Sequence, residues 1–196
     1  MESLLRLQDI TKSFYGIKVL KNVSFDLRKG EVHALLGENG AGKSTLIKII
    51  SGAYKLDSGK IILKGKDIHP GYGPKGAEDL GIVTIYQNFH LIPHLTVAEN
   101  LAIRKFTTEK GILVNWAVLY DQAKRALEKI NFPIDARSKV KDLSVAKKQM
   151  LEIAIALSKR AEIMIMDEPT AALRSFTLDR ASIGKLIFSK ALLAWS

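Results

Sequence analysis

One short segment constrains this chain more than any other: residues 37–45 read GENGAGKST, which matches the pattern G-x-x-x-x-G-K-[ST]. Its three glycines remove Cβ atoms, so the backbone can wrap with its N–H groups turned inward. The apolar run at 32–36 is typical of a buried strand, and residues 44–50 are typical of a helix. Unpaired N–H groups and the dipole at a helix start favour an anion. The segment therefore predicts a phosphate-binding loop.

The residue types in this loop have separate expected roles. Lys43 reaches the β- and γ-phosphates of a nucleotide, and the Ser44 hydroxyl is a ligand of Mg²⁺. The other members supply backbone N–H groups or the conformational freedom that turns those groups inward. We predict that the nucleotide is held by Gly37, Glu38, Asn39, Gly40, Ala41, Gly42, Lys43, Ser44 and Thr45.

Composition predicts a folded globular chain without covalent cross-links. Hydrophobic residues make up 47% of the 196 residues and charged residues 26%. No apolar run approaches the about 20 residues that span a bilayer, and the N-terminus lacks the plan of a signal peptide, so we expect a cytoplasmic protein. The absence of cysteine excludes disulfides and thiolate chemistry, and the four histidines lack the spacing of metal ligands.

The formal net charge is +10, which is compatible with nucleic acid, an anionic membrane surface or a solvated lysine-rich exterior. The basic residues are spread along the chain, without a dense basic block or interleaved aromatic residues. We therefore favour the lysine-rich exterior and expect no nucleic-acid partner.

The order of expected elements predicts an α/β fold. Residues 3–27 alternate in short β-like stretches, which indicates antiparallel sheet before the phosphate loop. Between about 88 and 142 the strand-like runs become fewer and apolar residues recur at helical spacing, which indicates a helical insertion. The spacing is clearest for Val118, Leu119, Ala123, Ala126, Leu127 and Ile130. The other expected elements are a strand pair around 58–65, a short helix at 74–80, a strand at 82–86, a helix at 144–158 and a strand at 163–166.

The last of these strands ends in two carboxylates, Asp167 and Glu168. A strand end beside a phosphate loop is where a metal ion and the attacking water lie. We predict that Asp167 holds Mg²⁺ and that Glu168 polarises the water. Apolar residues followed by acidic ones are weak evidence alone and strong evidence behind a phosphate loop.

Two further polar residues have more than one interpretation. Ser144 is the expected N-cap of the helix at 144–158, and a serine there usually bonds only its own helix amides. Gln87 follows the strand at 82–86 and, taken alone, is compatible with an ordinary surface amide.

In this order, the motifs resemble the ATPase subunit of an ABC transporter. The segments KSFYGIKVLKNVSFDLRKGEVHALLGENGAGKSTLIKIISG, YQNFHLIPHLTVAENL, LSVAKKQMLEIAIAL and MDEPTAAL are similar to the first half of monosaccharide-importer ATPases of the ribose, galactose and xylose type. The resemblance runs from about residue 4 to 173. It implies a P-loop NTPase core at 1–87 and 143–173, with an N-terminal antiparallel β subdomain, and an inserted α-helical subdomain at 88–142.

The resemblance also implies roles for four residues. Phe14 matches the aromatic residue that stacks on adenine, with Tyr15 as the alternative and core packing as the simpler role of either. Gln87 matches a glutamine that contacts Mg²⁺ and water. Ser144 matches a serine that reaches the γ-phosphate bound to another ATPase unit, and Ala146 lies in the same contact.

The partners implied by the resemblance follow from this arrangement. MgATP is bound in a head-to-tail sandwich with a second ATPase domain or a second copy of the chain. The helical insertion faces the transmembrane permease subunits, which work with a periplasmic or extracellular sugar-binding protein. The protein is then expected at the cytoplasmic face of the membrane.

The chain departs from the family pattern at two places. Ala146 stands where the family has glycine, and its methyl group hinders close approach to phosphate. After residue 173 the family continues with a helix, a buried strand and a histidine, whereas no histidine follows His94 here. We expect the atypical tail at 174–196 to form an amphipathic helix without a strand, as in a truncated or altered product of a longer ATPase. Two alternatives stay open: a nucleotide-binding remnant without turnover, and a ribosome- or nucleic-acid-associated ATPase of the same family.

Overall fold

The computed structural model describes residues 3–86, 89–108, 115–128, 132–159, 161–167 and 186–189, and among these leaves out the side chains of 104–108, 167 and 186–189. The chain forms two compact units. The sheet unit takes in the described residues up to 84, together with 161–167 and 186–189, and the helical unit takes in those between 85 and 160.

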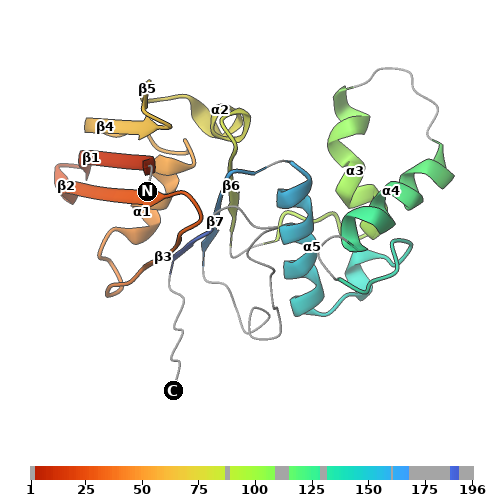
Figure 1. Cartoon of the computed structure of the whole chain (residues 1–196). Helices are drawn as coiled ribbons and strands as arrows, with labels where there is room; N and C mark the ends of the chain where they lie inside the picture. The colour runs from red at the N-terminus through yellow and green to blue at the C-terminus, as the bar shows by residue number, and fades with distance from the viewer. Residues whose placement is uncertain are drawn as a thin grey trace. The chain divides into compact units, whose positions relative to one another are not determined.

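The sheet unit begins with the antiparallel sheet that the sequence predicts. Strands β1 (Ser3–Phe14) and β2 (Ile17–Arg28) form a hairpin, and β4 (Ser58–Leu63) and β5 (Lys66–Ile68) extend the sheet in the order β2-β1-β4-β5 (Figure 1). Tyr15 and Gly16 at the hairpin turn both have positive φ, 50° and 81°, as in two-residue hairpin turns. Leu5 pairs with Leu27 on one side and Leu63 on the other, and all three are buried.

A second sheet has the strand order β3-β8-β7-β6, formed by β3 (Val32–Leu35), β8 (Leu186–Ser189), β7 (Ile163–Asp167) and β6 (Ile82–Ile85). Strand β8 pairs in parallel with both β3 and β7. Its last residue, Ser189, is level with Leu35 on one side and Asp167 on the other. The phosphate loop and the acidic strand end therefore start from the same edge of the sheet, two strand spacings or roughly 10 Å apart.

Strand β8 corrects the prediction for the tail. The sequence predicts an amphipathic helix and no strand after residue 173, but Leu186–Ser189 is a strand between β3 and β7. A short apolar run such as LIF is compatible with either element, because periodicity cannot separate a buried strand from a piece of helix. Other residues of the tail lie outside the described ones.

The prediction of a buried strand at 32–36 is also wrong in part. Val32 is 55% exposed and Leu36 is 72% exposed. Among the described strands, β3 stands at the edge of its sheet, with β8 as its one neighbour.

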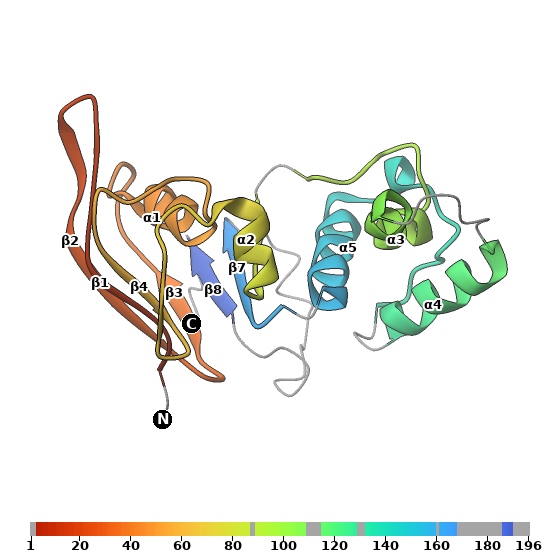
Figure 2. The same ribbon diagram turned by 90° about the horizontal axis from the view of Figure 1, so that it is seen from above.

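Helix α1 (Lys43–Ile50) follows the phosphate loop and fixes it to the core of the sheet unit. It buries Leu46, Ile47, Ile49 and Ile50. These side chains belong to one apolar cluster with residues of β1, β4 and β7, and with Ala77 of α2 (Gly73–Asp79). Figure 2 shows α1 and α2 beside both sheets of this unit. The loop therefore lies on a packed apolar base.

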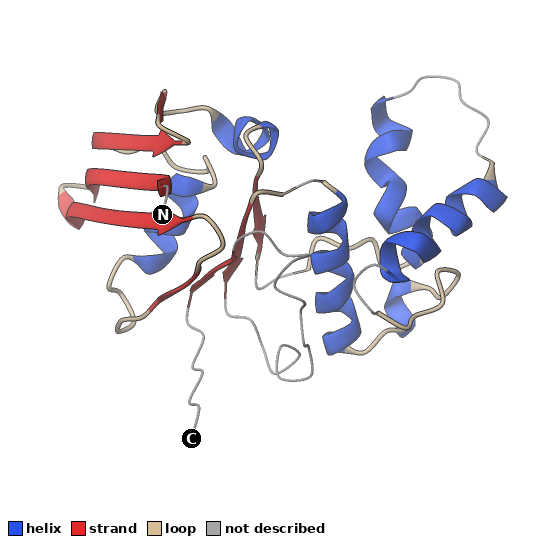
Figure 3. Ribbon diagram, in the orientation of Figure 1, coloured by secondary structure: helices blue, strands red, loops and turns tan. Residues whose placement is uncertain are grey.

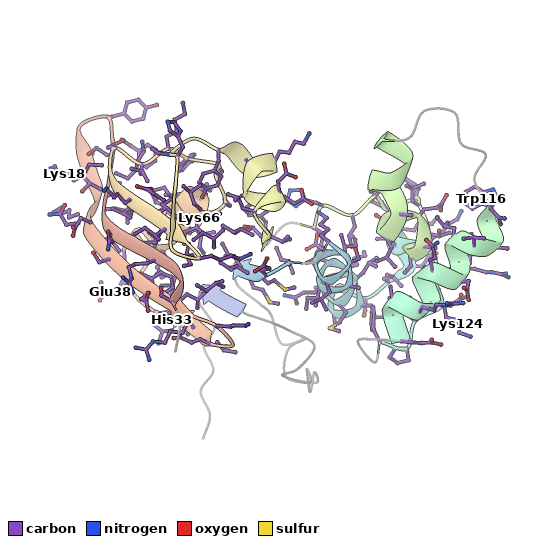
Figure 4. All side chains as sticks on the ribbon, turned by 45° about the horizontal axis from the view of Figure 1, so that its top comes forward. Lys18, His33, Glu38, Lys66, Trp116 and Lys124 are labelled. Atoms are coloured by element: carbon purple, nitrogen blue, oxygen red, sulfur yellow. The ribbon has the colours of Figure 1, made fainter. Side chains whose placement is uncertain are left out.

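The helical unit contains α3 (Val97–Thr108), α4 (Trp116–Glu128), the 3₁₀ helix η1 (Val140–Asp142) and α5 (Val145–Ser158) (Figure 3). Helix α4 buries Leu119, Ala123 and Leu127, as its spacing predicts, but Val118 of the same predicted stripe is 48% exposed. Trp116 and Lys124 project from this helix (Figure 4). Helix α5 contacts α3 and α4 and groups with them in this unit.

Candidate functional site

The phosphate loop ends in a glycine that starts a helix. Gly42 is the N-cap of α1 with φ 86°, in the left-handed region, and no side chain caps the helix. The first bond of the helix joins the Leu46 N–H to the Gly42 carbonyl at 2.9 Å. The N–H groups at the three preceding positions therefore have no partner within the helix and are available to an anion.

Gly42 also lies close to β2, which leaves little space for a side chain. An added Cβ would stand 2.7 Å from Leu20 Cδ2 and 3.1 Å from the carbonyl oxygen of Val19. Gly40 has the same φ of 86° but nothing within 4 Å of an added Cβ. The loop thus needs glycine at 42 for both backbone conformation and space, and at 40 for conformation alone.

Lys43 is folded back along the loop. Its Nζ donates to the carbonyl oxygens of Gly37 and Glu38, each at 2.6 Å. Both acceptors are uncharged, so these contacts leave the ammonium charge uncancelled. A phosphate that approaches the loop therefore meets a positioned positive charge.

These residues line a cavity of about 220 Å³. Its lining consists of Val19, Asn39, Gly40, Gly42, Lys43, Ser44 and Thr45. All of these residues except Val19 are predicted from the sequence. The predicted residues Gly37 and Glu38 do not line the cavity, but their carbonyl oxygens accept from Lys43. Ala41 donates its N–H to the Glu38 carbonyl. Sequence reasoning missed Val19 because its contact with the loop crosses 23 residues, and strand alternation gives no sign of it.

The predicted acidic residues are described only in part. Asp167 ends β7, level with Leu35 at the end of β3, while its side chain is among those left out. Glu168 and Gln87 lie outside the described residues, so their predicted roles stay predictions.

Phe14 and Tyr15 differ sharply in their surroundings. Phe14 ends β1, is half-buried, and meets Tyr54 edge-on with ring centroids 5.3 Å apart. Tyr15 is 104% exposed at the hairpin turn. Sequence reasoning missed Tyr54 and Asp57, which hold the Phe14 segment, because a tyrosine and an aspartate in a loop have no distinctive pattern.

The start of α5 is open. Ser144 is its N-cap and accepts from the Lys147 N–H at 3.4 Å, at the long end of hydrogen-bond distances. Ser144, Val145, Ala146 and Lys147 are all exposed. The predicted cap is confirmed, and the side chains around it are uncovered in this chain.

One buried carboxylate lies in the same unit. Glu152 of α5 accepts the His90 N–H at 2.7 Å, and burial raises its pKa. Nearby, Asn100 Oδ1 accepts the Ile92 N–H at 2.8 Å, and Asn100 Nδ2 donates to the Ile92 carbonyl oxygen at 3.1 Å. Two buried side chains therefore fix the segment that the resemblance predicts to face a membrane partner.

Within the described residues, none of the helices has the length and apolar character needed to cross a membrane. The same part of the chain has no cluster of three or more histidine and acidic side chains arranged for a metal ion.

Sequence comparison relates this chain to known proteins. Residues 20–171 match the family model of the ABC transporter domain. The chain is 50% identical over 173 residues to the ribose import ATP-binding protein RbsA 1 of Rubrobacter xylanophilus, covering 88% of this chain and 34% of that protein. It is 48% identical over 172 residues to the xylose import ATP-binding protein XylG of Geobacillus kaustophilus, covering 87% and 34%. It thus spans about a third of the length of these relatives.

A solved structure supports the same fold. An ATP-binding cassette of an ABC transporter in its ADP conformation superposes with a TM-score of 0.81 at 28% identity, covering 96% of this chain and 81% of that one. The predicted α/β fold with a phosphate loop, an antiparallel sheet and a helical part is confirmed.

Proposed function

Since the chain belongs to the ABC transporter family, whose model matches residues 20–171, we propose that it is the ATP-binding, energy-coupling subunit of a sugar importer. It binds MgATP at the phosphate loop and hydrolyses it to drive transport. The observation that carries this proposal is the cavity at the start of α1, which joins uncapped helix N–H groups to the ammonium of Lys43. This set of donors suits a chain of phosphates.

The residues around this cavity also fit Mg²⁺. Ser44 is exposed and lines the cavity, so its hydroxyl oxygen is available, and Asp167 ends the strand level with Leu35. Such hard oxygen ligands are those that Mg²⁺ takes, and Gln87 is a third candidate ligand. When bound, the ion neutralises charge on the phosphate oxygens. Glu168, the next residue after Asp167, polarises the attacking water.

The remaining partners follow from the open start of α5 and from the relatives. Ser144 and Ala146 are exposed, as a contact to a nucleotide on a second ATPase domain or second copy requires. The relatives named above are ribose and xylose import proteins, which favours a sugar as the cargo. The subunit then works at the cytoplasmic face of the membrane with permease subunits and a sugar-binding protein.

One observation favours a second candidate, a nucleotide-binding remnant without turnover. Ala146, which is exposed at the start of α5, stands where the family resemblance has a glycine that approaches the γ-phosphate bound to another ATPase unit. That contact is therefore altered, and losing one group that meets the γ-phosphate commonly costs about 100- to 1000-fold in rate.

Calorimetry with MgATP tests the binding step. Lys43→Ala should weaken binding by about 1.5–3 kcal/mol, the range for a hydrogen bond to a charged group. Lys66→Ala is the matched control, because Lys66 is an exposed lysine in β5, at the far edge of the antiparallel sheet. Equal affinity of the Lys43→Ala variant and the unaltered chain would refute the proposed phosphate site.

Phosphate release separates the two candidates. An active subunit hydrolyses MgATP, and Glu168→Gln lowers that rate by at least ~100-fold while ATP still binds. A remnant binds MgATP with release at background. Hydrolysis that survives Glu168→Gln would remove this residue from the reaction.

A further inference from the structure

Asp57 holds the end of the strand that carries Phe14. Its Oδ1 accepts from Lys12 Nζ at 2.7 Å, and its Oδ2 accepts from the Ser13 N–H at 2.6 Å. Its own N–H donates to the Thr11 carbonyl at 2.9 Å. The three residues immediately before Phe14 are therefore all bonded to one aspartate that is distant in the sequence.

The charge of Asp57 suits this task. The hydrogen bond from Lys12, followed by that from the Ser13 backbone, holds the pKa of Asp57 below its ordinary value. Both oxygens therefore act as acceptors throughout the neutral range, and the contacts are charge-assisted.

Tyr54, in the loop between α1 and β4 that also contains Asp57, contacts the Phe14 ring itself. Tyr54 meets Phe14 edge-on at 5.3 Å between centroids, with an interplanar angle of 65°. Lys12 Nζ lies 5.3 Å from the centroid of the Phe14 ring, so the residue that Asp57 holds also contacts that ring.

The loop between α1 and β4 also contacts α1, the helix that follows the phosphate loop. The Tyr54 N–H donates to the Lys48 carbonyl at 2.9 Å, and Lys48 Nζ lies 5.1 Å from the Tyr54 ring centroid. Lys48 is in the last turn of α1, the helix that opens with the phosphate loop. Residues 54–57 thus connect the phosphate site to the Phe14 segment.

We propose that Asp57 is a positioning residue for the nucleobase: by fixing residues 11–13, with Tyr54 against the ring, it presets Phe14 for stacking at a fixed distance from the phosphate loop. This inference rests on the proposed function, because it needs a nucleotide whose phosphates occupy the loop. Presetting matters because a ring that is already ordered loses less freedom when a ligand stacks on it. Tyr15, which is fully exposed, has no such support.

Two probes separate base binding from phosphate binding in the full 196-residue chain. ATP contains a base, and inorganic tripolyphosphate does not; both are titrated with Mg²⁺ by calorimetry. Asp57→Ala should weaken ATP binding by about 3- to 10-fold, the cost of ordering one or two side chains, and leave tripolyphosphate binding unchanged. Phe14→Ala should do the same, and the double variant should lose no more than Phe14→Ala alone, because Asp57 acts through Phe14.

Asp26→Ala is the matched control. Asp26 is bonded to Ser3 and to Arg6, the latter at 3.2 Å, at the opposite end of β1. This variant should bind both probes as the unaltered chain does, and circular dichroism checks that every variant is folded.

The outcomes separate this inference from the proposed function. It is overturned if Asp57→Ala leaves ATP affinity unchanged, if it weakens both probes equally, or if Phe14→Ala has no effect on ATP. An unaltered chain that binds neither probe would instead overturn the proposed function, and this inference with it.

Discussion

The two units fix their irregular segments by different means. In the sheet unit, the phosphate loop lies on an apolar cluster and is shaped by glycines at positive φ, with Gly42 pressed against β2. In the helical unit, residues 90–92 are held by the buried polar side chains of Glu152 and Asn100, which are 8% and 4% exposed.

The roles proposed for the two segments account for this difference. A loop that offers its own N–H groups to phosphate cannot have those groups bonded to side chains, so its shape depends on glycine and on packing from behind. A segment that offers side chains to a partner is free to use its backbone groups internally. Buried amide and carboxylate side chains satisfy those groups.

The largest expected effect tests the space behind the phosphate loop. Alanine at Gly42 or Gly40 meets the same backbone strain, about 1–2 kcal/mol, because both glycines have φ 86°. Only at Gly42 would the new Cβ also meet Leu20 and the Val19 carbonyl, so Gly42→Ala should lower the free energy of unfolding by about 2–5 kcal/mol. Urea unfolding of both variants checks this. Equal losses would show that β2 does not constrain the loop.

The next effect tests the polar support of the helical unit. Asn100 bonds the N–H and the carbonyl of Ile92, and also the Thr96 carbonyl at 3.0 Å. Asn100→Ala leaves the Ile92 groups unpaired and should cost about 1–3 kcal/mol, with faster hydrogen exchange near Ile92. Lys124→Ala is the control, since its 3.9 Å pair with Glu128 is on an exposed helix face and contributes at most about 0.5 kcal/mol. Exchange that is the same in both variants would contradict the comparison.

The two regions also differ in how far the sequence predicts them. The phosphate loop depends on residues within one segment, so its pattern predicts both its conformation and most of the cavity lining. The hairpin and the helices likewise follow from local periodicity. Side-chain supports that link distant parts of the chain do not, because Asp57 and Glu152 bond residues that are 44 and 62 positions away.

Strand β8 shows a further limit of local patterns. Its residues are apolar in a way that suits a helix or a strand, and the choice depends on β3 and β7, which flank it in the sheet. Tertiary pairing therefore decides an element that periodicity leaves ambiguous.

A smaller effect concerns the start of α5. Because the bond from the Lys147 N–H to Ser144 Oγ is long, at 3.4 Å, Ser144→Ala should lower the free energy of unfolding by only about 0.5–1 kcal/mol, near the low end for N-caps. Urea unfolding measures it. A loss of 2 kcal/mol or more, about the upper limit for a cap, would show that the serine is needed mainly by its own helix.

The smallest effect concerns the charge of Glu152, because Glu152→Gln keeps the shape and an oxygen for the His90 N–H. Burial raises the pKa of this carboxyl, against the opposing effects of the His90 N–H and Lys159. The folded chain therefore holds this proton to higher pH than the unfolded chain, so wild-type stability falls as pH rises from the ordinary pKa of 4.5 through the raised value.

Glutamine stays neutral, so Glu152→Gln should raise the free energy of unfolding at pH 8, with a gain that shrinks towards pH 4.5. Urea unfolding across this range, with the exposed Glu128→Gln as control, measures the difference. A gain that grows as the pH falls would show that the carboxylate is stabilised where it lies, and that the helical unit tolerates buried charge as well as buried amides.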